Sequence, residues 1–276
     1  MKIVILGASR GCGLALLKRL VFDDAAASQH TIHLLLRNPS SFSQHLCTLG
    51  MSLPSSVHLH QADALSISSL SCAFQSIRKH GGKVDLIVSS LGAVPVFEWK
   101  SGLKPRLQAG LERICADGTK NLLDVMRDST APTPALIVVS SNGIGQESLE
   151  RLPWILKFFY HHLLTHPHAD KHEMEELLHR AYGLHSDDFN PSAKSSSERS
   201  AAPFDPSKLL IVRPSLLTSG ARTGKYRISE AGSTLDSAWT ISREDVGHFI
   251  AESINESAGE AGSNALNRSG AYVVSY

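Results

Sequence analysis

Three glycines near the start of the chain have the spacing of a phosphate-binding loop. The stretch G-A-S-R-G-C-G places Gly7, Gly11 and Gly13 directly after the apolar run K-I-V-I-L. Glycine lets the backbone approach a phosphate closely, and the free N–H groups and dipole at the start of a helix hold the anion. Because a strand precedes the pattern G-x-x-x-G-x-G and a helix follows it, we predict that this loop, including Ser9 and Cys12, binds a dinucleotide.

Two arginines indicate which dinucleotide this loop should hold. NAD is bound by an acidic residue at the end of the second strand, whereas the 2′-phosphate of NADP is bound by arginine. The stretch L-L-L-R-N has Arg37 at that position with no acidic neighbour, and Arg10 lies within the glycine loop. We therefore expect both guanidinium groups to converge on the 2′-phosphate of NADP. An ordinary solvated charge is the alternative for Arg37.

Two further strand ends suit an adenosine. The stretch Q-A-D-A-L places Asp63, followed by Ala64, where a carboxylate can accept a hydrogen bond from the adenine amino group. The stretch S-S-L-G-A places Leu91 and Gly92 where the chain passes under the ribose. A helix cap or a tight turn is the alternative for both.

Short apolar runs recur along the chain, with helical patterns between them. They are apolar on both faces, as expected of parallel strands covered by helices. The runs span residues 3–6, 32–36, 57–60, 86–88, 136–139 and 209–212. Leu14, Leu17 and Val21 share one helical face after the first run, and G-T-K-N-L-L-D-V-M from Gly118 has the same character. We predict an α/β fold, a Rossmann-type doubly wound parallel sheet of six strands with helices on both faces and a small C-terminal substrate-side region.

The length of 276 residues suits one NAD(P)-binding domain over the whole chain. We expect residues 143–185 and 214–240 to form a substrate-side lobe. Residues 186–206 are rich in Ser and Pro and predict a flexible insertion, with a lid or a phosphorylated switch as the alternative.

Composition excludes several classes of protein. The net charge of +1 argues against nucleic acid as a partner. Four cysteines without C-x-x-C spacing argue against a zinc site and a disulfide framework. The chain has no apolar run of about 18 residues, so we expect neither a membrane span nor an export signal. We expect a cytoplasmic monomer or homodimer that binds a small apolar substrate and no membrane.

Several stretches together resemble an atypical short-chain dehydrogenase/reductase. They are G-A-S-R-G-C-G, the Asp63-Ala64 pair, S-S-L-G-A, G-T-K-N-L-L, V-V-S-S-N, I-V-R-P-S-L-L and S-R-E-D-V-G-H-F-I. The chain is more specifically similar to the NAD(P)H-binding, NmrA-like group, which includes flavin reductase (biliverdin-IXβ reductase), and to its fungal members. The resemblance covers nearly the whole chain and is weakest over residues 186–206.

The resemblance implies roles at the nicotinamide end of the site. The R-P-x-x-L stretch would bring the backbone around Pro214, Leu216 and Leu217 against the nicotinamide. In V-V-S-S-N, Ser140 would contact the cofactor and Ser141 would face the hydride. T-G-K-Y-R-I, from residue 223, resembles a substrate-side hairpin. The segment from Ser242 resembles a helix that Ser242 caps and whose dipole Glu244 and Asp245 favour.

A typical short-chain dehydrogenase donates a proton from the tyrosine of Y-x-x-x-K, whose lysine lowers the tyrosine pKa. None of the five tyrosines here has a lysine four residues later, so that mechanism is absent. The resemblance implies that Lys171 lies beside the nicotinamide ribose. Lys171 or Tyr160 could donate the proton, although a flavin or quinone can also take its proton from water.

The stretch H-H-L-L-T-H-P-H-A-D-K-H-E-M-E-E could suggest a metal site. If a helix begins near Pro167, then His168, His172 and Glu175 share one face at i, i+4 and i+7, a geometry that can bind zinc. The stretch lacks H-E-x-x-H and a nearby thiol, so we expect no metal. W-I-L-K-F-F-Y, from Trp154, either lines an apolar substrate pocket or packs as core.

These observations predict an NADPH-dependent oxidoreductase. It would reduce an apolar aromatic or conjugated substrate, such as a quinone, a flavin or a polyketide-like ketone, by hydride transfer without the Y-x-x-x-K tyrosine. An NmrA-like redox sensor that binds NADP(H) without turnover is one alternative. An isomerase or cyclase on the same fold is the other.

Overall fold

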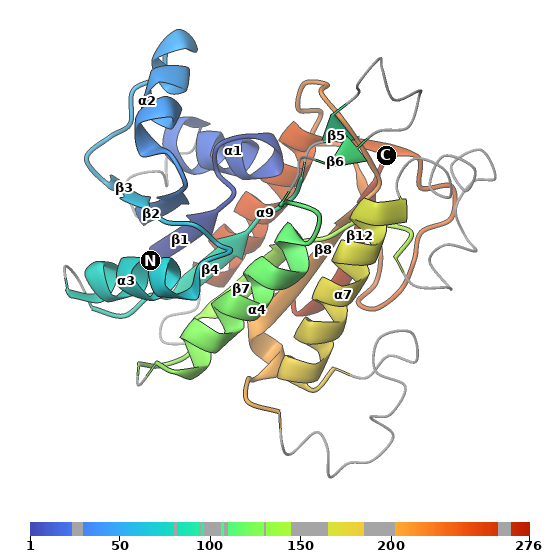
Figure 1. Cartoon of the computed structure of the whole chain (residues 1–276). Helices are drawn as coiled ribbons and strands as arrows, with labels where there is room; N and C mark the ends of the chain where they lie inside the picture. The colour runs from blue at the N-terminus through green and yellow to red at the C-terminus, as the bar shows by residue number, and fades with distance from the viewer. Residues whose placement is uncertain are drawn as a thin grey trace.

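An eight-stranded sheet forms the centre of the protein, with strand order β10-β12-β8-β7-β4-β1-β2-β3 (Figure 1). The computed structural model describes residues 1–23, 30–79, 82–93, 95–96, 106–107, 110–129, 131–144, 165–184, 202–258 and 266–276. The strands are β1 (Lys2–Leu6), β2 (Thr31–Leu36), β3 (Val57–Gln61), β4 (Leu86–Ser89), β7 (Ala135–Val139), β8 (Leu209–Pro214), β10 (Arg227–Ile228) and β12 (Gly270–Ser275). Within this sheet β10 runs antiparallel to β12, and the other pairs are parallel.

Helices cover both faces of this sheet (Figure 1). One layer contains α1 (Gly11–Lys18), α2 (Pro39–Thr48) and α9 (Arg243–Ala258), and the other contains α3 (Ile67–Lys79), α4 (Ile114–Arg127) and α7 (Thr165–Tyr182). Successive side chains of a strand point to opposite faces, so Ile3 and Ile5 pack in the first layer while Val4 and Leu6 pack in the second. Both layers are apolar, which explains why each strand is apolar on both faces.

The doubly wound fold and its six predicted strands are confirmed, since each predicted run lies in one of β1, β2, β3, β4, β7 and β8. The predicted helices after the first run and around Gly118 are α1 and α4. The expectation that the sheet has six strands was wrong, because β12 pairs with β8 and β10 extends the sheet beyond it. Val273 and Val274 of β12 are fully buried.

Shorter elements lie around the sheet. A π-helical turn, Arg19–Asp23, follows α1, and a 3-10 turn, Pro206–Lys208, precedes β8. Two small sheets pair β9 (Leu216–Thr218) with β11 (Thr240–Ser242) in parallel, and β5 (Pro95–Val96) with β6 (Arg106–Leu107) antiparallel. The T-G-K-Y-R-I stretch forms no hairpin within itself, since its strand β10 pairs with β12.

Most of the expected insertion, up to residue 201, lies outside the described residues. Within its last residues, Phe204 is buried against Tyr182, with ring centroids 5.1 Å apart, so this end of the segment belongs to the core. Among the described helices, none combines the length and apolar character that a membrane crossing requires. The cytoplasmic location remains a prediction.

Candidate active site

A cavity of about 500 Å³ opens at the carboxyl ends of β1, β2, β3 and β4. The strand order reverses at β1, where open α/β sheets bind their ligands. Eight of the residues predicted to bind the cofactor line this cavity together: Gly7, Ser9, Arg10, Arg37, Asp63, Ala64, Leu91 and Gly92. The parallel topology therefore brings four separate stretches of the sequence to one concave surface.

The three loop glycines serve different purposes. A Cβ on Gly7 would lie 2.3 Å from the carbonyl oxygen of Ser90, and one on Gly13 would lie 2.4 Å from the carbonyl oxygen of Gly7. These two glycines let β1, β4 and α1 pack closely. Gly11, with φ +61°, instead has open space around its Cβ position, with only an Arg243 carbon at 4.0 Å. The loop is thus an open cradle at the start of α1, which suits a diphosphate.

Cys12 contributes only backbone to this cradle. Its side chain belongs to the buried core, and burial raises the pKa of the Cys12 thiol to about 11. The thiol is therefore protonated at neutral pH and does not act as a nucleophile.

Two exposed guanidinium groups stand at the rim of the cavity. Among the described residues, the guanidinium groups of Arg10 and Arg37 have no hydrogen-bond or ion-pair partner. Helix α2 begins beside them, where Asn38 Oδ1 accepts a hydrogen bond from the Ser41 amide at 2.9 Å. Two positive charges beside a helix N-terminus favour a bound anion.

Asn38, Ser41 and His45 line the same cavity and were not among the predicted site residues. The signal was present in the sequence, because N-P-S-S directly after Arg37 is typical of a helix start. Because this helix starts directly after the second strand, its first residues lie beside the ligand site at that strand end.

Asp63 lines the cavity and also stabilises a tight turn, which was the alternative predicted for it. Its Oδ1 accepts from the Leu65 amide at 3.0 Å, and its own amide donates to Ser69 Oγ at 3.1 Å. These bonds fix the carboxylate at the cavity wall. They leave Oδ2 with no hydrogen-bond partner among the described residues.

Three side chains on one face of α7 meet the end of β7. His168 Nε2 lies 3.5 Å from Ser141 Oγ, Lys171 Nζ donates to the carbonyl oxygen of Ser140 at 2.6 Å, and Glu175 accepts a hydrogen bond from Ser140 Oγ. Their spacing is i, i+3 and i+7, which places them on one helical stripe. The structure therefore brings the predicted Ser141 and Lys171 together. The Ser140 hydroxyl is turned inward, to Glu175.

A buried ion pair fixes the far end of this stripe. Arg213, next to Pro214 at the end of β8, donates from Nε to both oxygens of Glu175 at 3.2 and 3.1 Å, and from Nη2 at 2.5 Å. Glu175 is fully buried and Arg213 is 6% exposed. Sequence reasoning missed Arg213 and considered Glu175 only as a possible metal ligand.

Asp170 anchors the same helix on its other side. Its two carboxylate oxygens accept hydrogen bonds from the backbone amides of Cys115, at 3.0 Å, and Ala116, at 2.8 Å. A carboxylate at these amides caps the start of α4 and complements its dipole. Helix α7 is thus held by α4 and by β8, which sets the positions of His168 and Lys171.

The three metal-type residues on α7 do not converge. His168 faces Ser141, His172 Nδ1 lies 3.7 Å from Glu176, and Glu175 is bound to Arg213. Among the described residues, no group of three His, Cys, Asp or Glu side chains is placed to hold a metal ion.

Burial and the positive charge of Lys171 lower the pKa of His168 to about 4. The imidazole is therefore neutral at pH 7. It carries one proton, on either of its two ring nitrogens.

The stretch R-P-S-L-L begins with the last two residues of β8 and lies next to the end of β7. The Pro214 carbonyl oxygen accepts from the Asn142 amide at 2.8 Å, which joins the two strand ends. Leu216 is 40% exposed, and Leu217 is partly buried against the core. Ser215 Oγ is buried and has no partner among the described residues, so a bound ligand with a polar group could satisfy it.

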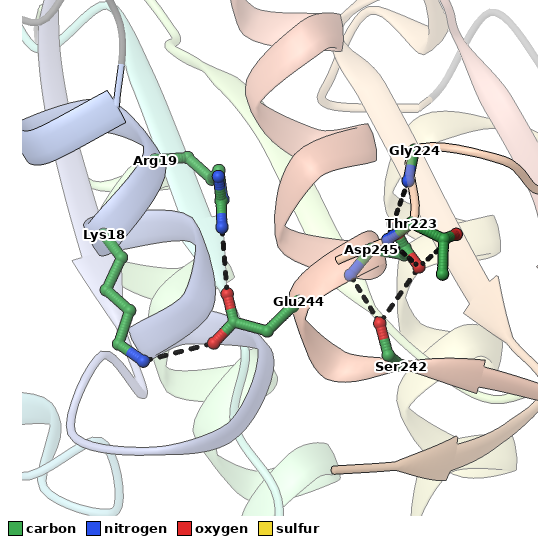
Figure 2. Close-up of polar contacts among 7 residues, drawn as sticks. All are labelled: Lys18, Arg19, Thr223, Gly224, Ser242, Glu244 and Asp245. Carbon is green, nitrogen blue, oxygen red and sulfur yellow. Dashed lines mark hydrogen bonds and ion pairs between the residues drawn. The ribbon is translucent and has the colours of Figure 1, made fainter. Parts of the chain in front are cut away.

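Helix α9 links the glycine-loop helix to the chain after β9 (Figure 2). Glu244 pairs with Lys18 Nζ at 3.1 Å and with Arg19 Nη2 at 3.3 Å. The adjacent Asp245 turns the other way and accepts from the amides of Thr223, at 2.9 and 3.1 Å, and Gly224, at 2.8 Å.

The predicted serine cap of α9 is present. Ser242 Oγ accepts from the Asp245 amide at 2.9 Å (Figure 2). This cap and the acidic pair make α9 the element that holds α1 and the loop around Thr223 in place.

Two predicted features lie outside the described residues. Tyr160, one of the candidate proton donors, is among them, as is the apolar stretch that begins at Trp154.

Comparisons with known proteins were made for sequence and for structure. No protein-family model matches the chain. The reductase pytE of Aspergillus terreus is 30% identical over 229 residues, which cover 79% of this chain and 80% of that protein. The oxidase pynE of Aspergillus niger is 29% identical over 188 residues, which cover 60% of this chain and only 58% of pynE.

Solved structures share the fold. A short-chain dehydrogenase/reductase of Veillonella parvula DSM 2008, solved in complex with NADP, superposes with a TM-score of 0.56 at 14% identity. The match covers 100% of this chain and 94% of that one. The likeness is one of fold, and the NmrA-like subgroup and the fungal origin stay predictions.

Proposed function

The chain belongs to the family of the reductase pytE, and on that premise we propose that it is an NADPH-dependent oxidoreductase. Its substrate in this proposal is an apolar aromatic or conjugated compound: a quinone, a flavin or a polyketide-like ketone. The reaction is hydride transfer without a Y-x-x-x-K tyrosine.

One observation carries the choice of cofactor. Arg10 and Arg37 line the same cavity as Gly7 and are exposed, and their guanidinium groups have no partner among the described residues. Two unpaired guanidinium groups next to the start of α2 suit a dianionic 2′-phosphate. NAD, with a neutral ribose hydroxyl at that position, would leave both charges unpaired.

The residues present fit the rest of the dinucleotide. The open space at Gly11 and the start of α1 receive the diphosphate, and Asp63 with Leu91 and Gly92 receives the adenosine. The orphaned Ser215 hydroxyl offers a hydrogen bond at the nicotinamide end. When bound, NADPH supplies a hydride to an electron-poor carbon or nitrogen of the substrate.

The remaining roles belong to side chains at the ends of β7 and β8. Lys171, held by the Ser140 carbonyl oxygen, orients the ribose through its ammonium group. Ser141 presents its hydroxyl to the substrate oxygen. The exposed Leu216 gives the substrate an apolar surface beside this polar pair.

NADPH oxidation, followed by absorbance with a panel of quinones, flavins and aromatic ketones, tests the proposal. We expect turnover with at least one acceptor. Reduced acceptor should form in equal amount to the NADPH consumed. Because one relative is named an oxidase, the experiment needs a second arm. This arm follows the reverse reaction, from NADP⁺ and the reduced acceptor.

Tight binding of NADPH without turnover in either direction would overturn the oxidoreductase and favour a redox sensor. Conversion of an acceptor without net NADPH consumption would instead indicate an isomerase. Both results leave the cofactor assignment standing, which a separate binding measurement decides.

A further inference from the structure

We propose that His168 and Ser141 form a proton relay, in which the Ser141 hydroxyl protonates the substrate oxygen and the His168 imidazole reprotonates Ser141. This inference rests on the proposed function and names the groups that replace the absent tyrosine. It assigns His168 a role as a positioning and relay residue, since it acts through Ser141.

The geometry of the two side chains supports this assignment. Ser141 Oγ donates to the Asn142 carbonyl oxygen at 3.2 Å, so its lone pairs are available to accept a proton. His168 Nε2 is 3.5 Å from Ser141 Oγ. This contact is long, but catalytic hydrogen bonds often tighten only when substrate is bound.

The pair lies where chemistry is expected in this fold. Ser141 follows the last residue of β7, and ligands of open α/β sheets bind at the carboxyl ends of the strands. Lys171 and Glu175, on the same face of α7 as His168, are both bonded to Ser140. These bonds fix α7 against the end of β7 and so set the position of the imidazole. A relay needs such fixed donors, because a misplaced proton donor loses most of its effect.

Three charged side chains of α7, those of Asp170, Lys171 and Glu175, lie near His168 in sequence, and the His168 ring is neutral. Lys171, one turn further along α7, is the charge that acts on the imidazole together with burial, and the two lower its pKa to about 4. Asp170 faces α4, and Glu175 faces Arg213. Both carboxylates are thus bonded to other elements, Asp170 to the start of α4 and Glu175 to Arg213 of β8.

The proton steps balance with water as the source. Hydride adds to the carbonyl carbon, the carbon–oxygen π bond opens, and the substrate oxygen takes a proton from Ser141 Oγ. The Oγ takes a proton from His168 Nε2 as His168 Nδ1 takes one from water. The imidazole ends as its other neutral tautomer, and the hydroxide left from water is neutralised by buffer.

Two variants and one matched control test the relay. We expect His168→Gln and Ser141→Ala each to lower the single-turnover rate of carbonyl reduction at least tenfold, with the Kd for NADPH changed less than about twofold. The double variant should be no slower than the slower single variant, because both groups serve one path. His172→Gln, on the same helix but facing Glu176, should keep the wild-type rate.

An NMR measurement gives a readout that does not need turnover. In wild-type protein labelled with ¹⁵N-histidine, we expect the His168 ring to be neutral at pH 6, with its proton on Nε2. Ser141→Ala should shift that tautomer equilibrium, whereas His172→Gln should not.

The outcomes separate this inference from the proposed function. A wild type that is active, and whose single-turnover rate is unchanged by His168→Gln, overturns the relay alone. The relay is also overturned if the His168 tautomer equilibrium is the same in wild type and in Ser141→Ala. An inactive wild type that binds NADPH tightly overturns the proposed function, and the relay with it.

Discussion

Lys171 donates its ammonium proton to the carbonyl oxygen of Ser140, 2.6 Å away, and so joins helix α7 to the end of strand β7. The lysine and the serine are far apart in sequence, and only the packing of α7 on the sheet brings them together. Around this bond lie the Ser141 hydroxyl, the His168 ring and the buried Glu175–Arg213 pair.

The first prediction concerns the choice of NADPH over NADH. Arg37→Asp should weaken NADPH binding about tenfold or more, since a charge-assisted bond to phosphate contributes roughly 1.5–3 kcal/mol and the new carboxylate repels the phosphate. Affinity for NADH should hold or rise. Isothermal titration with both cofactors measures the ratio.

Arg127→Asp, at the exposed end of α4, is the matched control and should leave the ratio unchanged. An unaltered preference for NADPH in Arg37→Asp would show that Arg37 does not contact the 2′-phosphate.

The second prediction separates steric from conformational demands on glycine. Gly7 and Gly82 have similar positive φ angles, +79° and +83°, but only Gly7 has a backbone atom within reach of an added Cβ. Gly7→Ala should therefore lower the free energy of unfolding by about 1–3 kcal/mol more than Gly82→Ala. Urea unfolding of both variants gives the difference, and equal losses would mean that the close packing of Gly7 on Ser90 is not needed.

The third prediction concerns the buried ion pair. Arg213→Met leaves the Glu175 carboxylate buried without its partner and should lower the free energy of unfolding by about 3–5 kcal/mol. Replacing both residues, with Arg213→Met and Glu175→Leu, should recover most of that loss. Chemical denaturation of the three proteins measures it, and a double variant as unstable as the single would contradict the account.

The fourth prediction is a pH dependence of stability. Burial, with a smaller contribution from Arg213, lowers the pKa of His179 to about 4, below the ordinary value of 6.5. Between these values the unfolded chain binds a proton that the folded protein does not, so the His179 contribution is present above pH 6.5 and lost as pH falls toward 4. The slope for one such histidine approaches about 1.4 kcal/mol per pH unit.

His179→Gln should flatten the fall in unfolding free energy between pH 6.5 and 4. Urea midpoints across this range provide the measurement, with the exposed His45→Gln as control for loss of a surface histidine. An identical slope in wild type and His179→Gln would rule out a depressed pKa at this position.

The sequence predicted six of the eight strands of the sheet because buried parallel strands are short apolar runs bounded by polar residues. β12 was missed because Gly270 and Tyr272 interrupt its apolar character, although its valines are buried. The two remaining strands are defined by their pairing, β12 with β8 and β10 with β12.

The cavity residues were predictable for a topological reason. Parallel strands end at one edge, so residues just after each strand, such as Arg37 and Asp63, must meet there. The contacts of α7 were not predictable in this way. Glu175 and Arg213 are 38 residues apart, and no local pattern says which face of α7 meets β8.

Transfer of deuterium from NADPH that carries deuterium at both C4 positions of the reduced nicotinamide tests the central claim most directly. Wild-type protein would be incubated with the labelled cofactor and an accepted aromatic ketone, and the product analysed by mass spectrometry. We predict one deuterium per product molecule, on the former carbonyl carbon, and a much slower transfer with Ser141→Ala. Product without deuterium, or no product from any ketone, quinone or flavin despite tight NADPH binding, would contradict the account.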